Sequence, residues 1–417
     1  MAGHTHIVGA GLAGLSAAIN LLKAGRDVSL YEASGHAGGR CRSYHDDTLD
    51  HRIDNGNHLV LSGNRAVMGY LKEIGASDSL TGPTAPEFPF YDLESAEQWT
   101  VALDAGFLPR AMLSKGGRVP GARRLDYLKA FHLAFAGKEA TVAQCLGPDN
   151  ALYRRFWEPL AVAVLNTDGD EAAASLLWPV IFETMGRGGS ACRPLTAKVG
   201  LSESFVDPAL AVLKDRGAEV SFNNRLRKLT IDSNRVTALT LGQDTVNLGE
   251  GDSIILAVPP SAAAELVPGL GAPDDFRAIV NGHFRLAQKT EGFSFLGLIG
   301  GVAQWLFVRG DIVSVTVSAA DDLVEQPTEV IAGRLWADVA KALNLGVAPM
   351  PTWRIVKEKR ATFAQTPSQV GRRPPARTAL NNLFLAGDWT DTGLPATIEG
   401  TLRSGVMASD ADLENLN

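Results

Sequence analysis

The chain has 417 residues, of which 45 % are hydrophobic, and its formal net charge is -7. This length suits two or three domains, and the acidic balance argues against a nucleic-acid partner because a phosphate backbone would be repelled. Its three cysteines, Cys41, Cys145 and Cys192, lack metal-ligand spacing, so we expect reduced thiols that serve as packing residues and no metal site.

The first predicted elements form a strand–helix–strand unit around a glycine-rich turn. Gly9, Gly11 and Gly14 follow the first strand and open a helix whose apolar residues recur at helical spacing over 15–23. Such glycines permit a tight turn, a close approach of backbone to a pyrophosphate, and close packing of helix on strand. Glu32 ends the second strand, where its carboxylate can accept hydrogen bonds from ribose hydroxyls. These features predict a bound dinucleotide.

The glycines that follow the second strand favour FAD over NAD. Gly38 and Gly39 with Arg40 would place bare backbone and a fixed cation beside the phosphates of the cofactor. The structural alternative is an ordinary glycine turn with a surface arginine.

A polar loop from Asp54 to His58 is the first candidate for proton chemistry. Gly56 permits backbone to lie near an isoalloxazine ring, and the Asp54 and His58 side chains can both transfer protons. The alternative is a hairpin turn whose polar side chains cap their own backbone.

Residues 76–193 show largely helical periodicity with many aromatic side chains. Phe156 and Trp157 could line an apolar pocket, although such a stripe at helical spacing is more often core. Glu158 follows them and is a candidate general acid, since burial raises the pKa of a carboxyl group.

Strand patterns return at 219–222 and 253–258, and residues 282–363 are expected to form antiparallel strands around one helix at 330–343. Within that block, the apolar stretch 293–308 is too short and too interrupted by glycine for a membrane span. It is predicted to form two strands joined by a Gly-Gly turn.

The closing part of the chain is predicted to be a strand at 382–388, a loop, and a helix at 399–412. Asp388 is placed to bond a ribityl hydroxyl or a phosphate-bound water. The helix N-terminus near Thr397 can point its positive end at the flavin. Alternatively, Asp388 is a simple helix cap.

The strands expected near residues 4, 28, 220, 254 and 383 are separated by other blocks, so the cofactor domain must be discontinuous. The predicted fold class is α/β, a Rossmann-like FAD-binding domain with an interleaved α+β substrate domain that has a helical part. The first strand begins almost at once, so we expect no signal peptide and a cytoplasmic protein. The FAD-binding domain is assigned residues 1–75, 191–265 and 371–417, and the substrate-binding domain 76–190 and 266–370.

Two short basic runs lie at 118–124 and 354–360. Such runs are usually solvated faces, and contact with a membrane or an anionic ligand is the alternative.

Taken together, the motifs resemble the amine oxidase and phytoene desaturase superfamily of flavoproteins. This resemblance depends on the glycine fingerprint and on segments 38–40, 385–388 and 397–400. Further segments resemble the squalene-associated branch of that superfamily, the hydroxysqualene dehydroxylases, and the likeness spans nearly the whole chain. These segments are 53–58, 156–160, 166–167, 304–307, 358–362 and 394–400.

The resemblance implies FAD as cofactor and reduction of hydroxysqualene to squalene in bacterial hopanoid synthesis, with the hydroxyl replaced by hydride. It also implies an adenine contact from backbone near Leu226. The catalytic candidates are Asp54, His58 and Glu158. The expected cofactor-binding residues lie in the motifs described above and are Gly9, Gly11, Leu12, Ala13, Gly14, Glu32, Ala33, Gly39, Arg40, Gly56, Asn57, Leu226, Gly387, Asp388, Thr397 and Ile398.

Three other functions are compatible with these motifs: a carotenoid or phytoene-type desaturase, an amine oxidase, and a non-catalytic lipid carrier. The sequence has no second glycine fingerprint for a nicotinamide cofactor, so we expect an external electron donor of unknown identity. A long isoprenoid substrate is almost insoluble in water, which predicts an apolar tunnel and a peripheral contact with the inner face of the membrane. The predicted contact surface is the helical block at 127–165.

Overall fold

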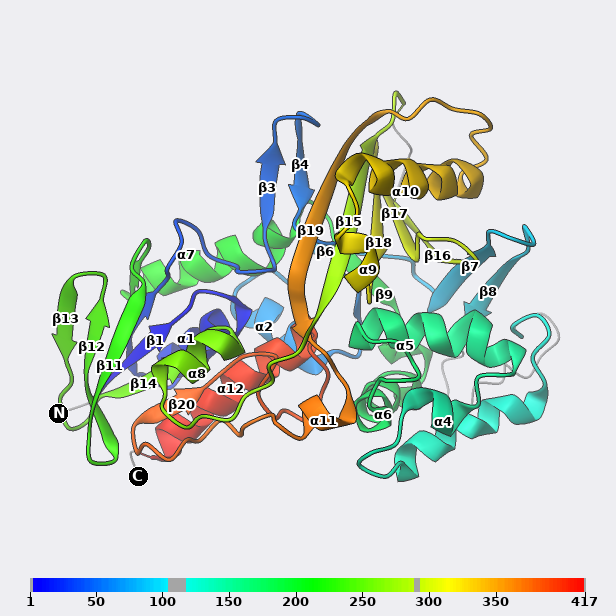
Figure 1. Ribbon diagram of the computed structural model, residues 1–417. Coiled ribbons are helices and arrows are strands. Elements are labelled where there is room, and N and C mark those ends of the chain that lie inside the picture. Colours follow the sequence, from blue (N-terminus) through cyan, green and yellow to red (C-terminus); the bar gives the residue numbers. More distant parts are fainter. Residues whose placement is uncertain (1–2, 104–117, 289–292, 416–417) are drawn as a thin grey trace.

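The computed structural model describes residues 3–103, 118–288 and 293–415 (Figure 1). A five-stranded sheet joins the N-terminal and C-terminal parts of the chain, and all of its neighbouring strands pair in parallel. Its order is β10–β2–β1–β14–β20, with the strands at Glu219–Ser221, Asp27–Tyr31, His4–Val8, Ser253–Leu256 and Leu383–Leu385. The prediction that these five separated segments build one sheet is confirmed.

This parallel sheet is buried on both faces because successive side chains of a strand point to opposite sides. Ile7 and its neighbours pack against α1 (Leu12–Lys23) and α12 (Ile398–Glu414). Val8 and its neighbours pack against a second sheet. That sheet contains β11, β12 and β13, at Leu226–Asp232, Arg235–Leu241 and Asp244–Asn247.

A seven-stranded, mainly antiparallel sheet forms the upper part of the molecule in Figure 1. Its β16 and β17 pair antiparallel, which confirms the predicted hairpin over 293–308. The prediction of a largely helical segment from residue 76 is wrong for its first part, because β7 and β8 join this sheet. The order is β19, β15, β18, β17, β16, β7 and β8, at Thr352–Phe363, Phe276–Arg285, Ile312–Val317, Trp305–Arg309, Phe293–Ile299, Glu87–Asp92 and Gln98–Ala102.

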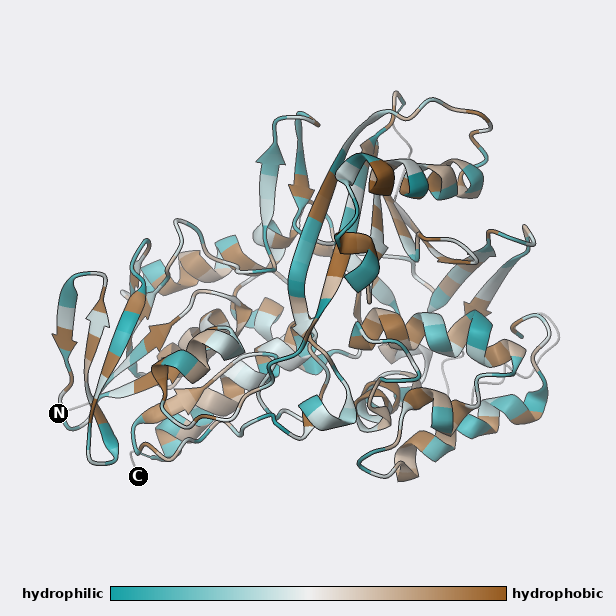
Figure 2. Ribbon diagram, in the orientation of Figure 1, coloured by the Kyte–Doolittle hydropathy of each residue, from teal (hydrophilic) through white to brown (hydrophobic). Residues whose placement is uncertain are grey.

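A helical block lies below this sheet, at the lower right of Figure 1, and its helices alternate apolar and polar residues along their length (Figure 2). Its inner side chains share one apolar core with aromatic residues of β7, β16 and β17. The block contains the 3₁₀ helix η1 (Arg124–Phe135), α4 (Val142–Leu146), the π-helical turn η2 (Tyr153–Trp157), α5 (Glu158–Leu165) and α6 (Ala174–Glu183).

Shorter elements connect these layers. The strands are β3 (Ser43–Asp46), β4 (His51–Asp54), β5 (Val60–Leu61), β6 (Leu80–Thr81) and β9 (Pro194–Ala197). The helices are α2 (Arg65–Glu73), α7 (Asp207–Asp215), α8 (Pro260–Leu266), α9 (Asp321–Val324), α10 (Thr328–Ala342) and α11 (Pro367–Val370), with the short turns η3 (Met185–Arg187), η4 (Gly189–Ala191) and η5 (Ser202–Val206).

The two large sheets draw on different parts of the chain. Every strand of the parallel sheet comes from 1–75, 191–265 or 371–417, and every strand of the seven-stranded sheet comes from 76–190 or 266–370. The exact domain boundaries stay a prediction. Within the described ranges, no helix combines the length and apolar character needed to cross a bilayer.

Candidate active site

The glycine-rich turn between β1 and α1 has the geometry of an anion-binding helix start. Gly9 has φ of 105°, and a Cβ there would lie 2.3 Å from the carbonyl oxygen of Ala257. A Cβ on Gly14 would lie 1.9 Å from the carbonyl oxygen of Gly9, whereas a Cβ on Gly11 would meet no atom within 4 Å. The first turn of α1 has no acidic residue and no side-chain cap. Its N–H groups can therefore bind a phosphate.

Glu32 lies beside this turn, directly after β2. Its carboxylate accepts hydrogen bonds from the backbone N–H groups of Ala10 and Ser34, both at 2.8 Å. Its own carbonyl oxygen accepts the N–H of Asn224 at 2.8 Å. This contact brings the segment that leads into Leu226 next to Glu32, and the Leu226 side chain is buried in the core below.

The second glycine segment contacts both the first turn and the C-terminal motif. Gly38 pairs with Gly11 across an isolated bridge, and Gly39 has φ of 58°. Arg40 follows, and it donates to a carboxylate oxygen of Asp388 at 2.8 Å and to the carbonyl oxygen of Ala361. The neighbouring Asp388 carboxylate raises the pKa of Arg40 above its ordinary value. A fixed cation thus lies beside the glycine turn.

The closing segment returns the chain to the same place. Gly387 has φ of 149°, and its N–H donates to the hydroxyl of Ser404 at 2.8 Å. Thr397 caps α12 by accepting the N–H of Gly400 at 3.2 Å, so Ile398 is the first helical residue. Farther along, a Cβ on Gly405 would lie 2.3 Å from the carbonyl oxygen of Ala13, because α12 packs directly on α1.

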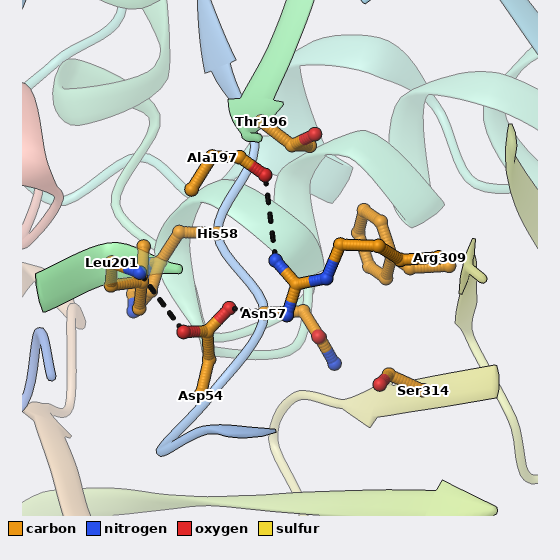
Figure 3. Close-up of a pocket in the computed structure, with 9 residues that line it drawn as sticks. Asp54, Asn57, His58, Thr196, Ala197, Leu201, Arg309 and Ser314 are labelled. Atoms are coloured by element: carbon orange, nitrogen blue, oxygen red, sulfur yellow. Dashed lines mark hydrogen bonds and ion pairs between the residues drawn. The ribbon is translucent and has the colours of Figure 1, made fainter. Parts of the chain in front are cut away.

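A small cavity lies where the loop after β4 meets the end of β17 (Figure 3). Asp54 is buried there and anchors three donors. One carboxylate oxygen accepts from the Ser43 hydroxyl at 2.6 Å and from the Leu201 N–H at 2.9 Å. The other oxygen accepts from Arg309 at 3.2 Å. The Asp54 side chain therefore bonds to Ser43, Leu201 and Arg309 and does not cap its own loop.

His58 and Asn57 line the same cavity. His58 is half-buried, and this burial lowers the pKa of its imidazole while the nearby Asp54 carboxylate acts to raise it. Asn57 donates to the hydroxyl of Thr316 at 3.1 Å. A Cβ on Gly56 would lie 3.2 Å from the amide nitrogen of Asn281, so this loop packs closely on the seven-stranded sheet.

Three polar residues of this region were missed from the sequence. Arg309 ends the apolar strand β17 and pairs with Asp54. Ser314 lines the cavity and bonds the Nδ1 atom of His283 at 2.8 Å. Burial lowers the pKa of His283 to about 4. For Arg309 the sequence did hold a signal, a single charged residue at the end of an otherwise apolar strand.

Glu158 is the one catalytic candidate that does not line this cavity. It begins α5, and burial, with the nearby Asp168 and Asp170, raises its pKa. Across the part of the chain that the structure describes, no group of three or more side chains could hold a metal ion.

Comparison with known proteins gives consistent matches along the whole chain. The flavin containing amine oxidoreductases match residues 12–290 and 306–411. A hydroxysqualene dehydroxylase of Sinorhizobium fredii is 46 % identical over 414 residues, with 99 % of each chain covered. Another, of Rhodopseudomonas palustris, is 47 % identical over 406 residues, with 97 % of each chain covered.

Solved structures with the same fold are more distant in sequence. A putative protoporphyrinogen oxidase from Exiguobacterium has a TM-score of 0.71 at 16 % identity, with 99 % of each chain covered. Cyclohexylamine oxidase from Brevibacterium oxydans has a TM-score of 0.71 at 16 % identity over 100 % of each chain. These likenesses show the amine oxidase fold and confirm the predicted fold class.

Proposed function

Because the chain belongs to the hydroxysqualene dehydroxylases, within the flavin containing amine oxidoreductases, we propose that it reduces hydroxysqualene to squalene with FAD as cofactor. The observation that carries this proposal is the extensive identity with dehydroxylases of that name along nearly the full length of both chains. A likeness confined to the glycine turn would support only nucleotide binding.

The residues around the glycine turn suit the adenosine and diphosphate half of FAD. The open backbone at Gly11 and the free N–H groups of the next residues, Leu12 and Ala13, would receive the pyrophosphate. Glu32 would bind the ribose hydroxyls, with Ala33 next to it. The backbone near Leu226 would contact the adenine.

The Arg40–Asp388 pair and the start of α12 suit the flavin half. Arg40 supplies positive charge toward a phosphate, while Asp388 keeps an acceptor for a ribityl hydroxyl. The N-terminal end of α12, at Thr397 and Ile398, would direct its partial positive charge at the pyrimidine edge of the flavin.

Bound in its reduced form, FAD supplies the hydride that replaces the hydroxyl group. The protein has to supply a proton, because hydroxide leaves poorly and must depart as water. We assign this role to His58, which lines the cavity and keeps a titratable ring there. Asp54 holds Arg309 and the backbone of Leu201 in place, and Glu158 lies outside the cavity lining.

The cavity is small, about 30 Å³, and its lining combines apolar and polar groups suited to the alcohol end of the substrate. Leu201 and Phe307 supply apolar contact for a hydrocarbon chain, while the hydroxyl groups of Thr196 and Ser314 can bond an alcohol. The Thr196 hydroxyl is buried without a hydrogen-bond partner among the described residues. An unpaired buried hydroxyl favours a substrate that brings its own polar group.

The proposal is tested by supplying the FAD-loaded enzyme with a chemical reductant and hydroxysqualene and analysing the products. Squalene is the expected product, formed only when enzyme and reductant are both present. A parallel reaction with phytoene, followed by pigment analysis, tests the desaturase alternative. A reaction with candidate amines, followed with an oxygen electrode, tests the amine oxidase alternative. Turnover of either in place of hydroxysqualene would overturn the proposal.

A further inference from the structure

The 3₁₀ helix η1 exposes large apolar side chains to solvent. Leu125 is 74 % exposed, Leu128 57 %, Phe131 50 % and Phe135 87 %. A 3₁₀ helix repeats every three residues, so Leu125, Leu128 and Phe131 form one straight row along the helix. We call these four side chains the η1 face.

A different row of the same helix supplies its attachment to the core. Tyr127 and Leu133 are buried in the apolar core of the helical block. The η1 face is therefore not an unpacked core surface. Tyr127 and Leu133 anchor the helix from its other side, and the side chains of the η1 face remain half or more exposed.

The apolar surface extends from η1 onto α6. Phe131 lies 6.5 Å from the Trp178 ring, and Trp178 lies 5.9 Å from the ring of Phe182, which is 50 % exposed. Contiguous apolar patches formed by several large side chains are uncommon on soluble proteins and mark interaction surfaces.

Basic residues border this surface although the whole chain carries a net charge of -7. Arg123 and Arg124 are exposed at the start of η1, and Lys138 is exposed shortly after its end. Asp126 is engaged in capping, since its carboxylate accepts the N–H of Arg123 at 2.9 Å. Glu139 is an exposed carboxylate on this border. Apolar residues between cations complement a bilayer with anionic headgroups.

Aromatic side chains link the core beneath η1 to the cavity. The Phe156 ring lies 6.3 Å from that of Phe90, which lies 5.6 Å from Trp305. Trp305 lies 6.4 Å from Phe295, and Phe295 is the cross-strand partner of Phe307 on the cavity wall. The apolar core beneath η1 is thus continuous with one wall of the cavity.

We propose that the η1 face docks on the surface of a lipid bilayer that contains anionic lipids, where the isoprenoid substrate is dissolved. The four side chains enter the interface and the flanking arginines contact headgroups. The account of substrate delivery rests on the proposed function, whereas docking itself is a separate property of this surface.

Flotation with vesicles tests docking without any assay of activity. FAD-loaded wild-type protein should float with phosphatidylcholine vesicles that contain phosphatidylglycerol. The Phe131→Ser/Phe135→Ser variant should lose about tenfold or more of this binding, because two large apolar side chains no longer enter the interface. Val347→Ser is the matched control, since Val347 is fully exposed elsewhere, and it should float like wild type. Arg123→Gln/Arg124→Gln should weaken binding only to the anionic vesicles.

Activity and association state separate this proposal from its rivals. The double phenylalanine variant should turn over detergent-dispersed hydroxysqualene like wild type and lose activity only toward vesicle-embedded substrate. If squalene forms neither from detergent-dispersed nor from vesicle-embedded substrate, the proposed function fails. The flotation experiment still decides whether the protein docks on vesicles. Wild-type protein that does not float, or variants that float unchanged, would overturn the proposal. So would a wild-type dimer that these substitutions convert to monomer without vesicle binding, since a second copy would then cover the face.

Discussion

Arg40 and Asp388, 348 residues apart in the chain, form an ion pair of 2.8 Å. Arg40 ends the glycine segment after the second strand of the parallel sheet, and Asp388 follows the last strand of that sheet. The N-terminal and C-terminal motifs therefore meet at the place where a parallel sheet binds nucleotides, at the carboxyl ends of its strands.

Loss of this pair should release the cofactor. Arg40→Ala leaves the buried Asp388 carboxylate without its cation and removes positive charge from the phosphate region, so we expect the Kd for FAD to rise by about 10- to 100-fold. Fluorescence titration of apoprotein with FAD measures this. Arg377→Ala removes an ion pair of the same 2.8 Å length with Glu414 at an exposed site. Arg377→Ala should leave the Kd for FAD unchanged. An equal rise in Kd for both variants would contradict the assignment of Arg40 to the cofactor site.

Gly14→Ala should prevent close packing of α1 on the first strand. The added methyl group would lie 1.9 Å from a backbone oxygen, so α1 would have to move. We expect loss of at least about 2 kcal/mol of unfolding free energy together with weak FAD binding. Gly69→Ala in α2 is the control, because its Cβ meets no atom within 4 Å. That change should stabilise the protein by up to about 1 kcal/mol. Denaturant unfolding measures the unfolding free energy of both variants. Similar free energies for Gly14→Ala and Gly69→Ala would refute the packing argument.

His58→Gln should lower kcat by about 100-fold or more while FAD still binds, because proton transfer to the leaving oxygen is lost. Glu158→Gln should keep nearly full activity, since Glu158 lies outside the cavity lining. Steady-state turnover of detergent-dispersed substrate measures both. If Glu158→Gln lost activity and His58→Gln kept it, Glu158 would be the acid. Burial raises the pKa of the Glu158 carboxyl group, which suits that role.

The pH dependence of kcat offers an independent check of His58. Burial lowers the pKa of this imidazole, so the protonated form that acts as acid is lost as pH rises through a value below about 6.5. We therefore predict that kcat falls with rising pH and that its midpoint lies on the acid side of that value. A midpoint above pH 7 would exclude His58 as the only proton donor.

Buried His283 should make the fold less stable in acid. Its pKa is lowered to about 4 by burial, against about 6.5 in the unfolded chain. Above pH 6.5 both states are neutral and stability is unaffected. As pH falls toward 4, only the unfolded state takes up the proton, which costs the folded state about 3 kcal/mol. Urea unfolding at several pH values should show that His283→Asn loses less unfolding free energy than wild type as the pH falls. The exposed His45→Asn control should retain the wild-type slope, and a His283 variant with that same slope would contradict this account.

The parallel sheet could be predicted because its strands carry strong local patterns. Short β-branched and aliphatic runs at Val8, Leu30 and Leu256 are bounded by glycine or proline, as buried parallel strands require. The prediction of helix failed at 87–102, where β7 pairs with the distant strand β16 and β8 pairs with β7. Pairing across such a distance leaves no local signal.

Some residues of the cavity could likewise be predicted from the sequence near them, and others could not. Asp54 and His58 could be selected from the sequence because they lie in one polar loop after a strand. Their partners could not, since Arg309 is 255 residues from Asp54 and reaches it only through the folded seven-stranded sheet. His283 and Ser314 become neighbours by antiparallel register, which no motif records.

The direction of electron flow is the central claim, and anaerobic mixing tests it most directly. The FAD-loaded enzyme is photoreduced, mixed with hydroxysqualene without oxygen, and followed by its visible flavin absorbance while the products are extracted. We predict that the absorbance of oxidised flavin returns and that squalene forms in equal amount. Flavin that stays reduced in the presence of hydroxysqualene would contradict the account.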